Sequence, residues 1–197
     1  METLKNIFKE DLSKNFREAE EISYRIDKVL RHSFPYALSR SKRPILYAIV
    51  KTVNPKTVIE TGIGPGVSST MILSALETGT LYSIDVRDKL ENGKSVGFLV
   101  PEELRHKWKV YIGESRAVLP KVLNEVEKVD VFLHDSEHTF ENVMFELTVV
   151  WEKLRRGGII LIDNLDFTDA PVLFSKKMGV NLYRLSEEAG GFGLIIK

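Results

Sequence analysis

Hydrophobic residues in the first quarter of the chain recur at the spacing of a helix. Apolar side chains repeat every three or four residues over 4–16 and again over 22–30, which predicts two amphipathic helices. The apolar run 45–50 predicts a third helix, because Pro44 just before it suits a first helical turn. We therefore expect residues 1–56 to form a helical extension that packs on the rest of the chain.

From residue 57 onward, short apolar and β-branched runs alternate with longer helix-like segments. Strands are predicted at 57–61, 80–84, 109–112, 129–133 and 159–162. Helices are predicted between them at 67–76, 115–126 and 140–154. This alternation is typical of an α/β fold with a parallel, doubly wound sheet and right-handed crossovers.

The end of the chain departs from this alternation. Two strands are predicted at 181–185 and 192–196, and the short segment between them, which contains Glu and Gly, predicts an antiparallel hairpin. We therefore expect a mostly parallel, seven-stranded sheet within 57–197, in a chain that forms a single domain overall. Residues 88–101 show little periodicity and predict a mobile loop near the ligand site.

Composition and charge narrow the function classes. Lysine and arginine number 28, as do aspartate and glutamate, so a neutral chain has no general attraction to nucleic acid or anionic membranes. The chain has no cysteine, which excludes disulfides, thiolate metal sites and a cysteine nucleophile. No apolar run approaches the roughly 20 residues of a membrane helix. We expect a cytoplasmic protein without nucleic-acid or membrane partners, and a homodimer through the N-terminal helices is a further hypothesis.

The run Glu60-Thr61-Gly62-Ile63-Gly64-Pro65-Gly66 carries the first chemical signal. It joins a predicted strand to a predicted helix, and glycines at alternate positions let the backbone turn tightly around a ligand. Ligands of open α/β sheets bind beyond the carboxyl ends of the strands. The alternative is a tight turn that binds nothing.

Other polar residues are expected at the same end of the sheet. Asp85 ends the second predicted strand, where a carboxylate suits both ribose hydroxyls; a helix cap or solvated turn is the alternative. The segment 113–115 follows the third strand, a natural place for adenine contacts. The full set of candidate cofactor-binding residues is Glu60, Gly62, Gly64, Gly66, Ser68, Asp85, Val86, Glu114, Ser115 and Asp135.

The glycine spacing indicates which nucleotide binds. G-x-G-x-G differs from the G-x-G-x-x-G of nicotinamide and flavin binders. The negative charge of Glu60 would repel the two phosphates of a dinucleotide and attract a cation. Both features favour S-adenosylmethionine, which carries an adenosine and a positive sulfonium but no phosphate. Glu60 is then expected near the methionyl amine, through water or backbone.

Four stretches resemble a known family. They are Val58-Ile59-Glu60-Thr61-Gly62, Ser83-Ile84-Asp85, Asp130-Val131-Phe132-Leu133-His134-Asp135 and Leu161-Ile162-Asp163-Asn164. From about residue 57 to the end, the chain resembles the class I S-adenosylmethionine-dependent methyltransferases. More narrowly it resembles the branch with catechol O-methyltransferase and the metal-dependent sugar and macrolide O-methyltransferases. The bulky apolar residues around the catechol site of that branch have no recognisable counterpart here.

The resemblance implies a metal and a base. Asp135, Asp163 and Asn164 would hold Mg²⁺ or another divalent cation, which prefers oxygen ligands, while the acceptor supplies hydroxyls. Such an ion lowers the pKa of a hydroxyl and fixes its oxygen in line with the methyl group. The alternative is that these residues cap the following helix and loop without metal.

His138, with Asp135, is the candidate catalytic residue. It stands where catechol O-methyltransferase has a lysine thought to take the hydroxyl proton, and an imidazole is a good base at neutral pH. The alternative roles of His138 are a metal ligand or an ordinary polar residue in the first turn of a helix. His134 is expected to be a semi-buried histidine with satisfied hydrogen bonds.

The N-terminal segment is basic between Asp27 and Glu60. It could line the substrate site and favour a phosphorylated or carboxylated acceptor, or it could simply face solvent. Its cationic residues are Lys28, Arg31, Arg40, Lys42, Arg43, Lys51 and Lys56.

The leading functional hypothesis is methyl transfer from S-adenosylmethionine to a hydroxyl of a small molecule. A nicotinamide oxidoreductase is disfavoured by the glycine spacing and by the lack of a Ser-Tyr-x-x-x-Lys-type relay. A non-catalytic binding or oligomerisation module is the third hypothesis. The sequence carries no signature that identifies the acceptor.

Overall fold

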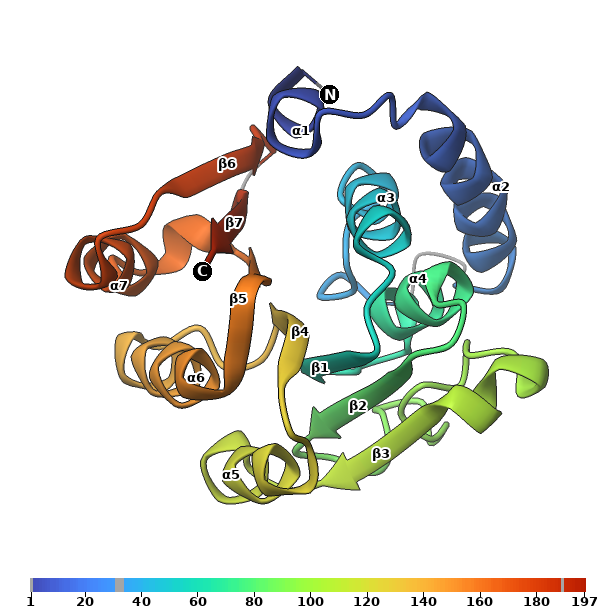
Figure 1. Cartoon of the computed structure of the whole chain (residues 1–197). Helices are drawn as coiled ribbons and strands as arrows, with labels where there is room; N and C mark the ends of the chain where they lie inside the picture. Colours follow the sequence, from blue (N-terminus) through green and yellow to red (C-terminus); the bar gives the residue numbers. More distant parts are fainter. Residues whose placement is uncertain (1, 31–33, 189) are drawn as a thin grey trace.

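A seven-stranded sheet forms the centre of the protein, in strand order β3-β2-β1-β4-β5-β7-β6 (Figure 1). The structure is a computed structural model that describes residues 2–30, 34–188 and 190–197. The strands are β1 (Thr57–Thr61), β2 (Thr80–Asp85), β3 (Trp108–Ile112), β4 (Val129–His134), β5 (Leu154–Asp163), β6 (Leu182–Ser186) and β7 (Phe192–Ile196).

The pairing confirms the predicted topology. β1 pairs in parallel with β2 and β4, and β2–β3 and β4–β5 are also parallel. β7 runs antiparallel to both β5 and β6, so it is the reversed strand of the sheet. The strand order changes direction between β1 and β4, and a ligand site is expected at the carboxyl ends of such a pair.

Helices cover both faces of the sheet (Figure 1). On one side lie α1 (Glu2–Phe8), α2 (Ser13–Leu30), α3 (Arg43–Val53) and α4 (Val67–Ala75). On the other lie α5 (Ser115–Glu125), α6 (Phe140–Lys153) and α7 (Ala170–Met178). Two short 3₁₀ helices, η1 (Glu102–Lys107) and η2 (Leu165–Phe167), lie in loops.

The strand residues alternate between two hydrophobic cores. On β4, Val131 and Leu133 pack with the N-terminal helices, whereas Phe132 packs with α5 to α7. Because both faces are buried, the central strands are nearly continuous apolar runs. One core cluster joins α1, α2 and α3 to the sheet, and the division of the chain at residue 56 remains a prediction.

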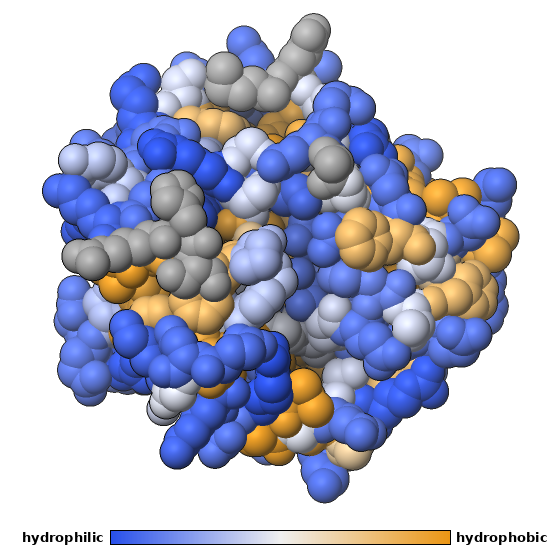
Figure 2. Space-filling view, turned by 180° about the vertical axis from the view of Figure 1, so that it is seen from behind, coloured by the Kyte–Doolittle hydropathy of each residue, from blue (hydrophilic) through white to orange (hydrophobic). Residues whose placement is uncertain are grey.

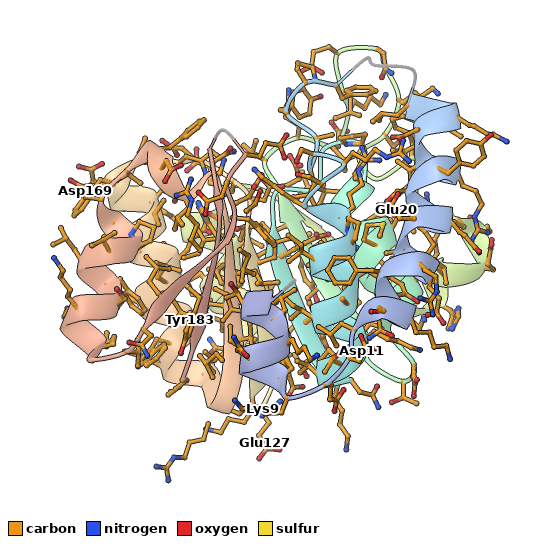
Figure 3. The ribbon with its side chains drawn as sticks, turned by 90° about the horizontal axis from the view of Figure 1, so that it is seen from above. Lys9, Asp11, Glu20, Glu127, Asp169 and Tyr183 are labelled. Atoms are coloured by element: carbon orange, nitrogen blue, oxygen red, sulfur yellow. The ribbon has the colours of Figure 1, made fainter. Side chains whose placement is uncertain are left out.

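Several local expectations were wrong. The break between the first two helices falls at residues 9–12, where Asp11 accepts the backbone N–H of Ser13 at 3.0 Å, and α2 then continues without interruption (Figure 3). β5 starts at Leu154, five residues earlier than expected, because Leu154 pairs in parallel with Val129 of β4 ahead of an irregularity in the register, and Gly157 N–H donates to Lys197 O beyond the end of β7. Helix α7 was not predicted.

The predicted loop 88–101 lies beside the glycine run, as expected. Gly97 N–H donates to the Gly64 carbonyl at 2.9 Å, and Leu99 N–H donates to the Pro65 carbonyl at 3.0 Å. Val96 and Val100 are buried. These contacts support the glycine run from outside; the mobility of the loop remains a prediction.

The face of the molecule in Figure 2 is mostly hydrophilic, with apolar side chains in several smaller groups. In the part of the chain that the structure describes, none of the helices has the length and apolar content needed to cross a bilayer. The cytoplasmic location, the absence of nucleic-acid partners and a homodimer through the N-terminal helices all remain predictions.

Candidate active site

The carboxyl ends of the parallel strands border a cavity of about 640 Å³. This volume lies within the range of pockets that bind small molecules. Loops that follow several strands line it, together with a segment before α3: 35–38, 62–65, Val67, Ser68, 84–87, 113–116, 135–138, Asn142, Asn164 and Phe167.

Most of the predicted cofactor-binding residues meet at this cavity. Gly62, Gly64, Ser68, Asp85, Val86, Glu114, Ser115 and Asp135 all line it. Glu60 and Gly66 do not, although they belong to the same run. Their assignment to the cofactor remains a prediction.

The backbone packing explains two of the glycines. Gly62 has φ +90°, and a Cβ there would lie 1.9 Å from the carbonyl oxygen of Asp135. Gly66 has φ +94°, and a Cβ there would lie 2.7 Å from Gly97 Cα. A side chain at either position would collide with neighbouring backbone, so both glycines are required by the fold itself.

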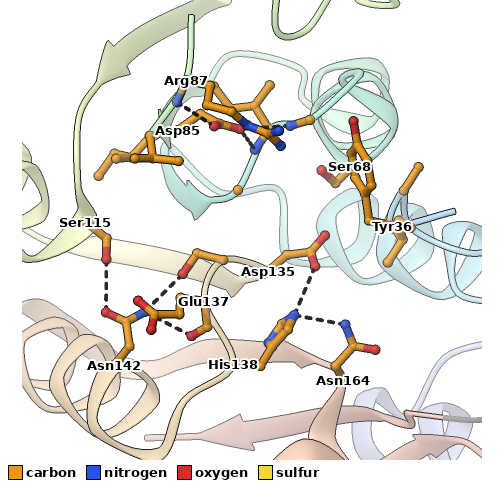
Figure 4. Close-up of a pocket in the computed structure, with 18 of the residues that line it drawn as sticks. Tyr36, Ser68, Asp85, Arg87, Ser115, Asp135, Glu137, His138, Asn142 and Asn164 are labelled. Carbon is orange, nitrogen blue, oxygen red and sulfur yellow. Dashed lines mark hydrogen bonds and ion pairs between the residues drawn. The ribbon is translucent and has the colours of Figure 1, made fainter. Parts of the chain in front are cut away.

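Asp85 binds the glycine run directly. Its Oδ2 accepts the backbone N–H groups of Ile63 at 2.9 Å and Gly64 at 3.0 Å, while Oδ1 accepts the N–H of Arg87 at 3.0 Å (Figure 4). The carboxylate is largely buried yet lines the cavity. The loop N–H groups that could hold a phosphate are thus directed at a carboxylate.

Glu60 is completely buried beneath the glycine run. Its Oε1 accepts the hydroxyls of Ser69 and, at 2.6 Å, Ser83, whereas Oε2 has no hydrogen-bond partner among the described residues. Burial raises the pKa of Glu60 to about 7, against the opposing effect of the serine hydroxyls. At neutral pH this carboxyl is therefore close to half protonated.

The predicted metal ligands contact Lys42, which the sequence placed only among the basic residues of the N-terminal segment. Lys42 precedes α3, and its Nζ donates to Asp163 Oδ1 at 2.6 Å with both side chains buried. Asp135 is hydrogen-bonded to Asp163; burial and then the Asp163 charge raise the pKa of Asp135 well above its ordinary value.

Asn164 turns its amide nitrogen toward a histidine. Its Nδ2 lies 2.9 Å from His138 Nε2 (Figure 4), and its Oδ1 lies 2.5 Å from where a Cβ of Gly190 would be. Among the described residues, no group of three or more histidine and acidic side chains is placed to hold a metal ion. As arranged, with an ammonium on Asp163 and an amide nitrogen facing the site, the three residues do not fit a divalent ion.

A chain of side chains leads from the core to His138. Glu146 on α6 accepts from Thr61 Oγ1 at 2.6 Å and lies 2.8 Å from His134 Nδ1, and His134 Nε2 lies 3.2 Å from His138 Nδ1. Burial alone would raise the pKa of Glu146, but hydrogen bonds from His134 and other donors outweigh it and lower the pKa to about 2.

Hydrogen-bond partners constrain the tautomers of both histidines. A carboxylate only accepts, so His134 Nδ1 carries a proton toward Glu146, and an amide nitrogen only donates, so His138 Nε2 accepts from Asn164 Nδ2 at 2.9 Å. His138 therefore keeps a lone pair on Nε2, the nitrogen nearest Asn164 and 3.9 Å from Asp135 Oδ1. Burial is the main cause that lowers the pKa of His138 to about 4, so the ring is neutral at pH 7.

Comparison with known proteins agrees with this geometry. A family model described as a methyltransferase domain matches residues 59–165, more than half of the chain. The chain belongs to this methyltransferase family. The match confirms the resemblance derived from the sequence and places the enzyme among the transferases. Curated protein sequences gave no match.

Solved structures of methyltransferases share the fold of this enzyme. The O-methyltransferase from Bacillus cereus, in complex with SAH, has a TM-score of 0.70 at 15% identity, covering 100% of this chain and 96% of its own. TomG from Streptomyces achromogenes, an O-methyltransferase in complex with SAM, has a TM-score of 0.67 at 17% identity, and the match covers 89% of this chain and 88% of TomG. A putative caffeoyl-CoA O-methyltransferase from Staphylococcus aureus has a TM-score of 0.70 at 15% identity, and the match covers 86% of this chain and 91% of that protein. At these identities the likeness shows the class I methyltransferase fold.

Sequence reasoning missed the contacts that two buried residues make with the candidate site. Glu146 lies one turn after Asn142 on the otherwise apolar face of α6, a pattern of buried polar residues that could have been noticed. Lys42 gave no such signal, because its partner Asp163 is 121 positions away.

The basic N-terminal residues are mostly paired with acids. Arg40 and Arg43 both bind Asp27, at 2.9 and 2.6 Å, and Lys51 binds Glu77 at 3.0 Å. Arg31 lies outside the described residues. The proposed basic surface for an anionic acceptor therefore gains no support from these three residues.

Proposed function

We propose that the cavity binds S-adenosylmethionine and that the enzyme transfers its methyl group to a hydroxyl of a small molecule. The observation that carries the proposal is the pairing of Asp85 with the N–H groups of Ile63 and Gly64. A pyrophosphate at the glycine run would meet this negative charge. An adenosyl ligand avoids that conflict, and one of its ribose hydroxyls can donate to the lone pair of Asp85 Oδ1 that stays free.

The remaining cavity residues suit the two ends of such a ligand. Val86 is exposed and lies with Glu114 and Ser115 on the wall next to Asp85, where an adenine would lie. Gly62 and Asp135 line the part of the cavity nearest His138, where the methionyl end would face the acceptor. Contact between Glu60 and the methionyl amine is not part of the proposal, because Glu60 does not line the cavity.

His138 is the proposed general base. Bound S-adenosylmethionine supplies an electrophilic methyl group and a neutral sulfur leaving group. As the acceptor oxygen bonds to the methyl carbon, the carbon–sulfur electron pair returns to sulfur and the hydroxyl proton passes to His138 Nε2. Burial disfavours the imidazolium that results, and the charges of Asp163 and Glu146 offset part of that cost.

Calorimetry and a transfer assay test the proposal. We expect S-adenosylhomocysteine to bind the purified chain and NAD not to bind, and methyl transfer to appear in a panel of hydroxylated acceptors. The panel should include phenolic compounds, since one solved structure of the same fold is described as a putative caffeoyl-CoA O-methyltransferase. Binding of NAD in place of the homocysteine compound would contradict the proposal. Binding without transfer to any acceptor would support the non-catalytic alternative.

A further inference from the structure

Lys42 places a positive charge inside the carboxylate cluster. Its side chain is 4% exposed and that of Asp163 is 6% exposed, so neither charge is solvated by bulk water. An isolated charge at such depth is strongly unfavourable, and the 2.6 Å contact supplies its compensation. Among the described residues, Asp163 is the partner that holds this ammonium in place.

The residues before Lys42 and the helix after it are both held in place by tertiary contacts. Ser39 Oγ donates to Glu188 Oε2 at 2.6 Å, and Ser41 donates to the same oxygen. Lys42 is followed by α3, which packs against α2 and α4. The lysine is therefore fixed by its neighbours and does not reach Asp163 from a free surface position.

A divalent ion on the same carboxylate would face this ammonium at close range. Magnesium binds carboxylate oxygens at about 2.0–2.1 Å, a shell from which a second cation is excluded by charge. Asn164 directs its amide nitrogen, which carries two protons, toward His138. The ammonium and the amide orientation thus oppose a metal at two of the three expected ligands.

We propose that Lys42 supplies the positive charge for which the sequence suggested a divalent ion, and that this methyltransferase works without a metal. Lys42 is then a positioning residue: its ammonium holds the Asp163 carboxylate at 2.6 Å and fixes the Asp135–Asp163 pair beside His138. The claim that turnover is metal-independent rests on the methyl transfer proposed above. The claim that the site rejects divalent ions does not.

Manganese binding and turnover test the two claims separately. Chelator-treated protein is titrated with Mn²⁺ and followed by electron paramagnetic resonance, and methyl transfer is measured in excess EDTA and in added Mg²⁺. We expect no stoichiometric Mn²⁺ binding and the same turnover in both conditions. One Mn²⁺ per chain that is lost in Asp163→Asn, or turnover abolished by EDTA and restored by Mg²⁺, would overturn the proposal.

Two variants isolate the charge of Lys42. Lys42→Met keeps much of the length of the side chain and removes the ammonium, so Mn²⁺ affinity should rise by about tenfold or more as the two carboxylates lose their cation. Lys42→Arg keeps the charge and should gain no Mn²⁺ affinity. Equal Mn²⁺ affinities of folded Lys42→Met and wild type would count against the role of the ammonium. If Lys42→Met does not fold, the wild-type titration still decides.

Binding of S-adenosylhomocysteine to the same samples separates this proposal from the proposed function. If the homocysteine compound does not bind, the methyl-transfer function fails, while the Mn²⁺ titration still decides whether the cluster accepts an ion. If it binds and turnover depends on a metal, the function stands and the role of Lys42 fails.

Discussion

His138 Nδ1 lies 3.2 Å from His134 Nε2, and this contact determines which nitrogen of His138 can act as a base. His134 is itself held by the ionised Glu146 in the core. The row of side chains runs from a carboxylate through two imidazoles to the cavity and places the lone pair of His138 at Nε2, 2.9 Å from the amide nitrogen of Asn164.

Replacing His138 should slow the chemical step without weakening ligand binding. We expect His138→Gln to lower kcat by about 10²-fold or more, the usual contribution of a general base, and to leave the affinity for S-adenosylhomocysteine near the wild-type value. His106→Gln, at an exposed histidine on η1, is the matched control and should change neither quantity. An unchanged kcat in His138→Gln would exclude this residue as the base.

His138 should also make the protein less stable in acid. Its pKa falls from 6.5 to about 4 on folding, so the unfolded chain takes up a proton between these values and the folded chain does not. The stability from His138 is complete above pH 6.5 and is lost as the pH falls toward 4, by at most about 3 kcal/mol. Urea unfolding of wild type and His138→Gln at pH 7.5 and 5 measures the difference, which should shrink or change sign at the lower pH.

Glu60 should give the opposite pH dependence. Its pKa rises from 4.5 to about 7 on folding, so the stability it contributes is complete below pH 4.5 and is lost as the pH rises through 7. Glu60→Gln should therefore gain up to about 3 kcal/mol relative to wild type between pH 5 and 8. Glu127→Gln, at an exposed position, should show no such trend. A parallel pH dependence of Glu60→Gln and wild type would contradict the raised pKa.

Asp85→Asn should weaken cofactor binding. The change removes the charge that accepts two loop N–H groups, and each hydrogen bond from a ribose hydroxyl to that charge is worth about 1.5–3 kcal/mol. We expect the Kd of S-adenosylhomocysteine to rise by about tenfold or more, measured by calorimetry. Asp88→Asn, three residues further along and exposed, is the control and should bind normally.

Alanine substitutions at two glycines separate the cost of a steric collision from the cost of backbone strain. Gly62→Ala places a Cβ 1.9 Å from a carbonyl oxygen at φ +90° and should destabilise the fold by about 3 kcal/mol or more. Gly93→Ala, at φ +78° with nothing within 4 Å, should cost only the strain of about 1–2 kcal/mol. Urea midpoints compare the two, and equal losses would mean that the backbone at Gly62 can move away from Asp135.

The sequence predicted the parts of this protein that depend on local pattern. Apolar runs located all seven strands and the hairpin; the central strands are apolar throughout because both of their faces are buried, whereas the edge strands β3 and β6 are partly exposed. The glycine run and Asp85 were recognised because a position where two backbone segments approach closely requires glycine, and the acid stands at a strand end. Helix α7 was missed because its apolar positions include exposed Val172 and Leu173, which blur the periodicity.

The site was predicted less completely than the fold. Asp135, Asp163 and Asn164 were correctly placed together at the strand ends, but the cation beside them comes from a distant segment. Local spacing cannot report a contact between residues 42 and 163, and Lys42 has no feature that distinguishes it from neighbouring solvated cations. A buried ion pair of this kind depends on tertiary packing alone.

The attachment of Ser39 and Ser41 to Glu188 has a consequence for how the protein is made. During synthesis on the ribosome the N-terminal helices emerge first, yet this segment has no docking site until the C-terminal hairpin has followed. Contacts so distant along the chain form late, since closing a long loop costs entropy before the contact is gained. The nascent chain should therefore build its sheet and cores before it acquires a working site, and catalytic competence should be the last property to appear.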